Sequence, residues 1–127
     1  MLIKADQAMH RLYATLGWGI IALGLLHVAS APRSLTPSTL WFASGGLAMI
    51  LTGLLNLLNR SYGSQAAGLR RVCIGVNAIM VAFALLSGSV NRATPSQLVI
   101  VLGLFGGAGA LSVLRRALLP RAVQRAV

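Results

Sequence analysis

His27 is the side chain in this sequence whose chemistry is most versatile, because it is the one histidine inside a long apolar run. Polar side chains are costly in hydrocarbon and often mark function there. An imidazole in such a place can ligate haem or contact a quinone head group. It can also simply hydrogen-bond to Ser44, Ser87 or Ser89, which the order of the runs places at a similar depth. We expect the hydrogen-bonded histidine.

Asn56 and Asn77 are the other polar candidates inside the apolar runs. Asn56 lies near the end of the run 37–58 and Asn77 about a turn and a half into the run 72–90, so both lie toward the same side of the membrane and their depths match. We expect the two amides to hydrogen-bond to each other, with a net value of about 1 kcal/mol or less per bond. The alternative is that they line a route for a substrate.

Reactive groups of other kinds are scarce. The chain has a single acid, Asp6, and it lies outside the apolar runs. General acid–base catalysis usually needs a carboxylate or a histidine pair, and cation-coupled carriers usually need a buried carboxylate. Cys73 is the single cysteine, so an intrachain disulfide, a dithiol pair and a metal site of several thiolates are excluded. We therefore expect that the protein is not an enzyme and that it binds no metal and no cofactor. The open alternative is haem or quinone bound at His27.

Composition indicates what must position these residues. The 127 residues are 57% hydrophobic and 9% charged, and the mean hydropathy is +0.81. Apolar runs cover approximately residues 12–31, 37–58, 72–90 and 95–114. About 20 apolar residues cross a bilayer as a helix, and lipid offers the backbone no other partners. We expect an all-α, polytopic single domain over residues 1–127, with four transmembrane helices in two hairpins and a basic tail, 115–127.

Two of the runs have matching starts. Thr36 and Thr94 are each followed by proline, the pattern of a helix N-cap with proline at the first helical position. Thr-Pro-Ser follows Arg33 in one case and Arg92 in the other. Either a duplicated hairpin or convergence on a favourable helix start explains the similarity.

The basic residues predict orientation. The net charge is +10, and nine of the eleven Lys and Arg residues lie on one side of the four runs, against Arg33 and Arg92 on the other. Such a bias over short loops predicts that both termini are cytoplasmic in a bacterial inner membrane. Four arginines are expected at lipid head groups, namely Arg70, Arg71, Arg115 and Arg116. This placement does not resemble a nucleic-acid footprint.

The start of the chain also imitates a cleavable signal peptide, since Lys4 and Arg11 precede an apolar run that ends in small residues. The run is longer than the usual 7 to 15 residues of such a region. We expect the first run to remain as a transmembrane helix.

Small residues line several of the predicted helices. Gly103 and Gly107 form a G-x-x-x-G pair, and Gly106 and Ala110 repeat the spacing. A comparable ridge is formed by Ser44, Ala48 and Thr52, while Gly17 and Gly24 lie two turns apart in the first run. We expect these faces to pack within one bundle, and a seam between copies is the alternative.

Tyr13 and Trp41 lie near the ends of runs and are expected to anchor at the membrane interface. The sequence thus predicts a small protein that works by helix packing, as an accessory or assembly subunit or as a homo-oligomer. The alternative is a minimal carrier or channel for an anionic or lipophilic substrate, with His27, Asn56 and Asn77 lining the route.

Overall fold

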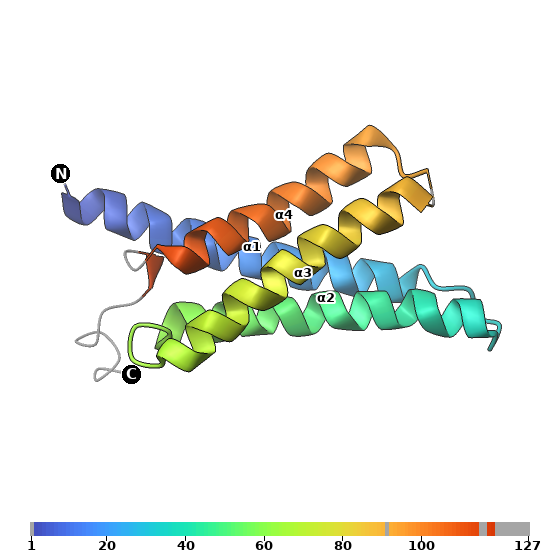
Figure 1. The fold of residues 1–127 in the computed structure, drawn as a ribbon, viewed down its shortest axis with the longest axis horizontal. Coiled ribbons are helices and arrows are strands. Elements are labelled where there is room, and N and C mark those ends of the chain that lie inside the picture. The colour runs from blue at the N-terminus through green and yellow to red at the C-terminus, as the bar shows by residue number, and fades with distance from the viewer. Residues whose placement is uncertain (1, 91, 115–116, 119–127) are drawn as a thin grey trace.

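The computed structural model contains four α-helices, and it describes residues 2–90, 92–114 and 117–118. The helices are α1 (Leu2–Ala29), α2 (Pro37–Tyr62), α3 (Ala67–Val90) and α4 (Pro95–Val113). All four are long and apolar enough to cross a membrane. Figure 1 shows that the start of α1, the connection from α2 to α3 and the end of α4 lie at the same end of the molecule, which we call the basic end.

The helices extend beyond the apolar runs on which the prediction rested. α1 begins at Leu2 rather than near residue 12, α2 continues to Tyr62, and α3 begins at Ala67 rather than at residue 72. Arg60, Arg70 and Arg71 therefore lie in helices and not in a loop. Backbone hydrogen bonding continues past the apolar part of a helix, and long arginine side chains carry their charge outward from it. Arg115, Arg116 and most of the predicted basic tail lie outside the described residues.

The threonine caps are present as predicted. The side chain of Thr36 accepts a hydrogen bond from the backbone N–H of Thr39 at 3.3 Å. At α4 the cap is reciprocal, because Thr94 accepts from the N–H of Gln97 at 3.4 Å while the Gln97 side chain accepts from the Thr94 N–H at 3.0 Å. Both helices thereby satisfy backbone donors that lack intrahelical partners.

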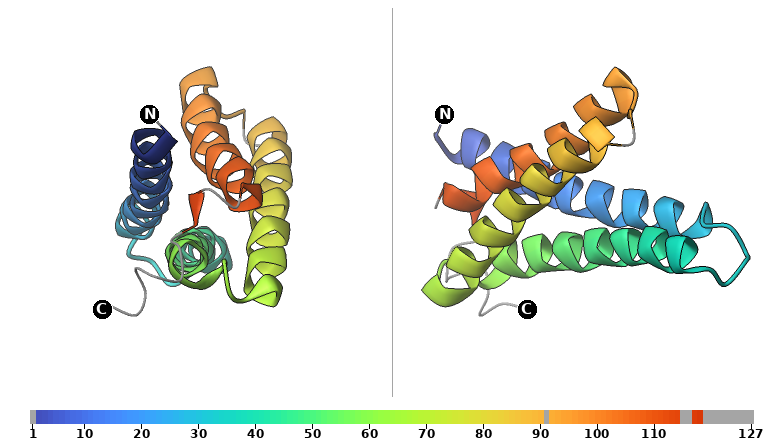
Figure 2. Two further views of the ribbon diagram at one scale, coloured as in Figure 1. Left: turned by 90° about the vertical axis from the view of Figure 1, so that its left-hand side faces the viewer. Right: turned by 45° about the vertical axis from the view of Figure 1, so that its right-hand side comes forward.

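Helices α1 and α2 share the most extensive interface, followed by α3 and α4. Figure 2 shows the α3–α4 pair inclined across the α1–α2 pair. The buried hydrophobic cluster between α1 and α4 includes Tyr13 and Ile20 on one side and Phe105, Ala108 and Leu111 on the other. The outer surface is rich in exposed aliphatic and aromatic side chains, among them Leu86, Val90, Val99 and Trp41. A surface of this kind suits lipid better than water.

Close approach of α1 and α2 is made possible by glycine. A Cβ built on Gly24 would lie 2.7 Å from the Gly46 carbonyl oxygen, and one built on Gly53 would lie 2.8 Å from the Gly17 carbonyl oxygen. Gly17 and Gly24 thus face Gly53 and Gly46, with the same spacing on both helices. The backbones touch where any larger residue would separate them.

Candidate functional site

Asn56 is the centre of a buried polar cluster, which we define as Tyr13 of α1, Asn56 and Asn59 of α2, and Cys73 and Asn77 of α3. All five are at most 1% exposed. They meet because Asn56 and Asn59 lie where α2 contacts both α1 and α3. The cluster lies in the half of the molecule toward the basic end.

Asn56 and Asn77, which were predicted to pair, are joined by two hydrogen bonds. Asn77 donates from Nδ2 to Asn56 Oδ1 at 3.0 Å, and Asn56 donates from Nδ2 to Asn77 Oδ1 at 3.2 Å. Their remaining amide hydrogens go to carbonyls one turn earlier in their own helices, Thr52 at 2.8 Å and Cys73 at 2.8 Å. The predicted link between α2 and α3 is therefore confirmed, and it saturates both NH₂ groups.

Tyr13 extends this pair into a chain of hydrogen bonds. Asn59 donates from Nδ2 to the Tyr13 hydroxyl at 2.9 Å, and the hydroxyl donates to Asn56 Oδ1 at 3.0 Å. The Cys73 thiol donates to the same Asn56 oxygen at 3.4 Å. Consecutive bonds of this kind polarise one another in a low-dielectric interior. Tyr13 is therefore not the interfacial anchor that the sequence suggested, because its ring is fully buried.

One hydrogen-bond acceptor of the cluster is unsatisfied. Asn59 Oδ1 is buried and accepts no hydrogen bond from the described residues. It points toward the end of α2, since a Cβ at Gly63 would collide with it. A buried acceptor without a donor carries a desolvation cost of about 1–3 kcal/mol.

Tyr13, Asn59 and Cys73 were not among the predicted site residues. The sequence alone did not distinguish them as site residues, since a tyrosine near a helix end and a lone cysteine both have common structural roles. The signal that could have found them is helical spacing, because Asn59 follows Asn56 by one turn and Cys73 precedes Asn77 by one turn.

His27 lies at the opposite end of the bundle, away from this cluster. Its imidazole stacks on Phe42, with ring centroids 3.9 Å apart and an angle of 19° between the planes. Two of the serines predicted as partners bond within their own helices instead: Ser44 donates to the Trp41 carbonyl and Ser89 to the Leu86 carbonyl. Aromatic stacking thus accounts for one face of the ring. His27 and the asparagine pair do not share a site.

The small residues of α4 divide between different surroundings. Gly107 faces α1, with Leu16 Cδ1 at 3.1 Å from a Cβ built on it, and Gly109 faces Asn77 of α3, with a corresponding distance of 3.3 Å. A Cβ on Gly103 or Gly106 would have no neighbour within 4 Å among the described residues. The expectation that the G-x-x-x-G face packs as a whole within the bundle is therefore wrong for Gly103 and Gly106.

The predicted ridge on α2 also differs from the observed contact. Thr52 is buried, but Ser44 is exposed, and Thr52 donates its hydroxyl to the Ala48 carbonyl at 2.8 Å. The residues that meet α1 are Gly46 and Gly53. They occupy a neighbouring face of the same helix, which the ridge of Ser44, Ala48 and Thr52 does not include.

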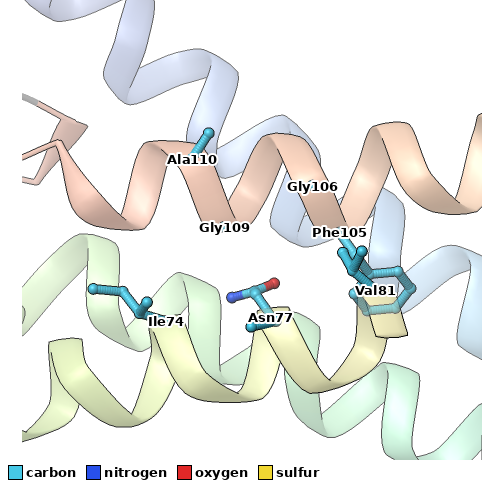
Figure 3. A pocket seen from close by; sticks show the side chains of 8 residues that line it. Ile74, Asn77, Val81, Phe105, Gly106, Gly109 and Ala110 are labelled. Atoms are coloured by element: carbon cyan, nitrogen blue, oxygen red, sulfur yellow. The ribbon is translucent and has the colours of Figure 1, made fainter. Parts of the chain in front are cut away.

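An open groove of about 290 Å³ runs between α3 and α4. Figure 3 shows Asn77 on α3 beneath Gly109 on α4, with Phe105 and Val81 at one end of the groove. Gly106 and Ala110 form part of its α4 wall and are exposed. The amide of Asn77 is turned toward Asn56, so the groove itself is largely apolar.

Among the residues that the structure describes, no three His, Cys, Asp or Glu side chains are grouped so as to hold a metal ion. The chemistry available at the cluster is hydrogen bonding by neutral groups. Comparison of the chain with protein families, with curated proteins and with solved structures finds no match in any of the three.

Proposed function

We propose that this chain is a small bacterial inner-membrane protein that works by helix packing and has no catalytic machinery. In this proposal the helices cross the membrane as two hairpins with both termini in the cytoplasm. The placement of nine of the eleven basic residues on one side supports that orientation. The protein acts as an accessory or assembly subunit of a membrane complex or as a homo-oligomer.

The observation that carries the proposal is the uncovered small-residue face of α4. Gly103, Gly106 and Ala110 are exposed, and the two glycines have open space where a side chain would be. Interhelical contact in lipid depends on close backbone approach, which such a face allows. A transmembrane helix of a partner or of a second copy would gain packing contacts there that lipid chains supply poorly.

The buried polar groups support a packing role over a transport role. Asn56, Asn77, Tyr13 and Cys73 bond to one another inside the bundle. Asn77 also lines the groove between α3 and α4, but it is 1% exposed and its amide is engaged in these bonds. Apart from the acceptor of Asn59, the groups of this network are satisfied by one another, and the network links three helices in one arrangement.

Co-purification tests the proposal. Two differently tagged copies of the chain are expressed together in a bacterial host, extracted in mild detergent and captured through one tag. We expect capture of either the second tag or a stoichiometric membrane protein, and we expect Gly106→Leu and Ala110→Leu to reduce it at least tenfold. Gly68→Leu is the control, because Gly68 also has open space but lies in the first turn of α3.

The two forms of the proposal have different outcomes. Capture of the second tag identifies a homo-oligomer, and capture of a different protein identifies an accessory subunit. A monodisperse monomer with no partner, or capture that Gly106→Leu and Ala110→Leu leave unchanged, would contradict both forms.

A further inference from the structure

Two residues beyond the end of α4, Ala117 and Leu118, are buried against the bundle. Ala117 is 0% exposed and Leu118 is 2% exposed, and both belong to the hydrophobic cluster that contains Tyr13 and Leu111. Residues that follow the last transmembrane helix ordinarily lie in water or among head groups. These two pack in the same cluster as residues of α1 and α4.

Hydrogen bonds tie this segment to two other helices. The Ala117 carbonyl lies 2.9 Å from His10 Nδ1 of α1. The His10 carbonyl in turn accepts from Arg60 Nε of α2 at 2.9 Å. The Ala117 N–H donates to the Leu114 carbonyl at 3.0 Å. The end of α4 is thereby linked through α1 to the end of α2.

The segment lies next to the polar cluster. His10 precedes Tyr13 by about one helical turn on α1, and Tyr13 is bonded to Asn59. Asn59 Oδ1, the buried acceptor without a donor among the described residues, points toward the same end. Water that reached this end of the bundle would find an unused hydrogen-bond acceptor beside it.

We propose that Ala117 and Leu118 form a latch that closes the basic end of the bundle over the polar cluster, and that its release admits water to Asn59 and Tyr13. Among the described residues, the latch contacts the rest of the bundle through the Leu118 side chain, the Ala117 methyl group and the hydrogen bond to His10. Its local opening is therefore far easier than unfolding of a helix pair. The inference does not depend on the proposed packing function.

Cys73 reports on opening of the polar cluster, because it is bonded to the cluster residues next to the latch. It is the single cysteine of the chain, it is fully buried, and its thiol lies 3.6 Å from the Tyr13 hydroxyl. A maleimide can react with it only when the cluster opens. We expect N-ethylmaleimide to label the full-length protein slowly in detergent or liposomes at a fixed pH.

Two variants weaken the latch by different chemistry. Leu118→Ala removes apolar packing, and His10→Leu removes the hydrogen bond to Ala117 while keeping a side chain of similar size. We expect each to speed labelling of Cys73 by about tenfold or more, because the labelling rate follows the population of the open state. Val113→Ala is the matched control, since Val113 lies in the last turn of α4 and is 58% exposed.

The results distinguish opening from unfolding. Circular dichroism must show full helix content in each variant, and if Leu118→Ala loses it, the milder Leu118→Val takes its place with the same expected direction. Faster labelling in the latch variants, with wild-type rates in Val113→Ala, supports the latch. Equal rates in wild type, His10→Leu and the Leu118 variant, or equal acceleration by Val113→Ala, would overturn it.

Discussion

Asn56 accepts three hydrogen bonds at one oxygen, from a phenol, a thiol and an amide that come from two other helices. Because all of these donors are buried, removal of the shared acceptor leaves several of them unsatisfied at once. The position is therefore more sensitive to substitution than any single bond within it suggests.

The coupling between Asn56 and Asn77 is measurable by a double-mutant cycle. We expect Asn56→Leu and Asn77→Leu each to destabilise the protein, and the double variant to be less destabilised than the sum by about 0.5–1.5 kcal/mol, since the reciprocal pair can be lost only once. Reversible unfolding in mixed detergent micelles gives the four free energies.

Ile79→Ala serves as the control for this cycle, because Ile79 lies two residues beyond Asn77 on α3 and is 67% exposed. Its effect is expected to add to that of Asn56→Leu within about 0.5 kcal/mol. Strict additivity of the two asparagine substitutions would mean that the amide pair contributes nothing to stability.

At the scale of the elements, facing glycines allow the backbones of α1 and α2 to approach closely. Gly24 and Gly46 each leave too little room for a Cβ beside the partner's carbonyl oxygen, whereas Gly103 on α4 has open space. The same chemical change therefore has opposite consequences on different helices.

We expect Gly24→Ala to destabilise the protein by about 1–3 kcal/mol through overpacking. Gly103→Ala is expected to be neutral or to stabilise by up to about 1 kcal/mol, because alanine is the better helix former. Unfolding midpoints of the two variants check the contrast. A Gly24→Ala variant as stable as the wild type would show that the backbones of α1 and α2 are not in contact at Gly24.

The connection from α3 to α4 contains a second backbone feature. Arg92 has φ of 51°, in the left-handed region, and it is the one non-glycine residue of this kind among those described. A side chain there costs about 1–2 kcal/mol relative to the ordinary conformation. The adjacent Ala93 N–H donates to the Gly88 carbonyl at 3.0 Å, which ends α3.

Arg92→Gly is expected to be more stable than Arg33→Gly by about 1 kcal/mol. Both variants remove an arginine from a connection at the same end of the bundle, but only position 92 has a positive φ. Thermal unfolding in one detergent compares them. The prediction fails if Arg33→Gly is the more stable of the two.

At the scale of the whole molecule, the charge bias predicts which end faces the cytoplasm. Topology can be read with single cysteines in a Cys73→Ser background. We expect a membrane-impermeant maleimide to label Ser34→Cys in intact bacteria, and to label Gly68→Cys only after the membrane is opened. Ser34 lies in the connection from α1 to α2, and Gly68 lies at the basic end. The reverse pattern would mean that the termini are outside the cytoplasm.

The sequence by itself determined the four apolar helices, the threonine caps and the pairing of Asn56 with Asn77. These depend on properties that are local or one-dimensional. An apolar run of sufficient length has no alternative to a helix in lipid, Thr-Pro starts a helix wherever it occurs, and two asparagines at equal depth in neighbouring helices have few other partners.

Only the tertiary structure decided which faces of those helices meet. Gly46 and Gly53 contact α1 while Gly103 remains uncovered, although all three are glycines in apolar helices. Tyr13 and Cys73 hydrogen-bond to Asn56, and Ala117 hydrogen-bonds to His10. Each of these outcomes depends on how the helices are rotated about their axes, and that rotation follows from the packing of all four together, which hydropathy along a single chain does not encode.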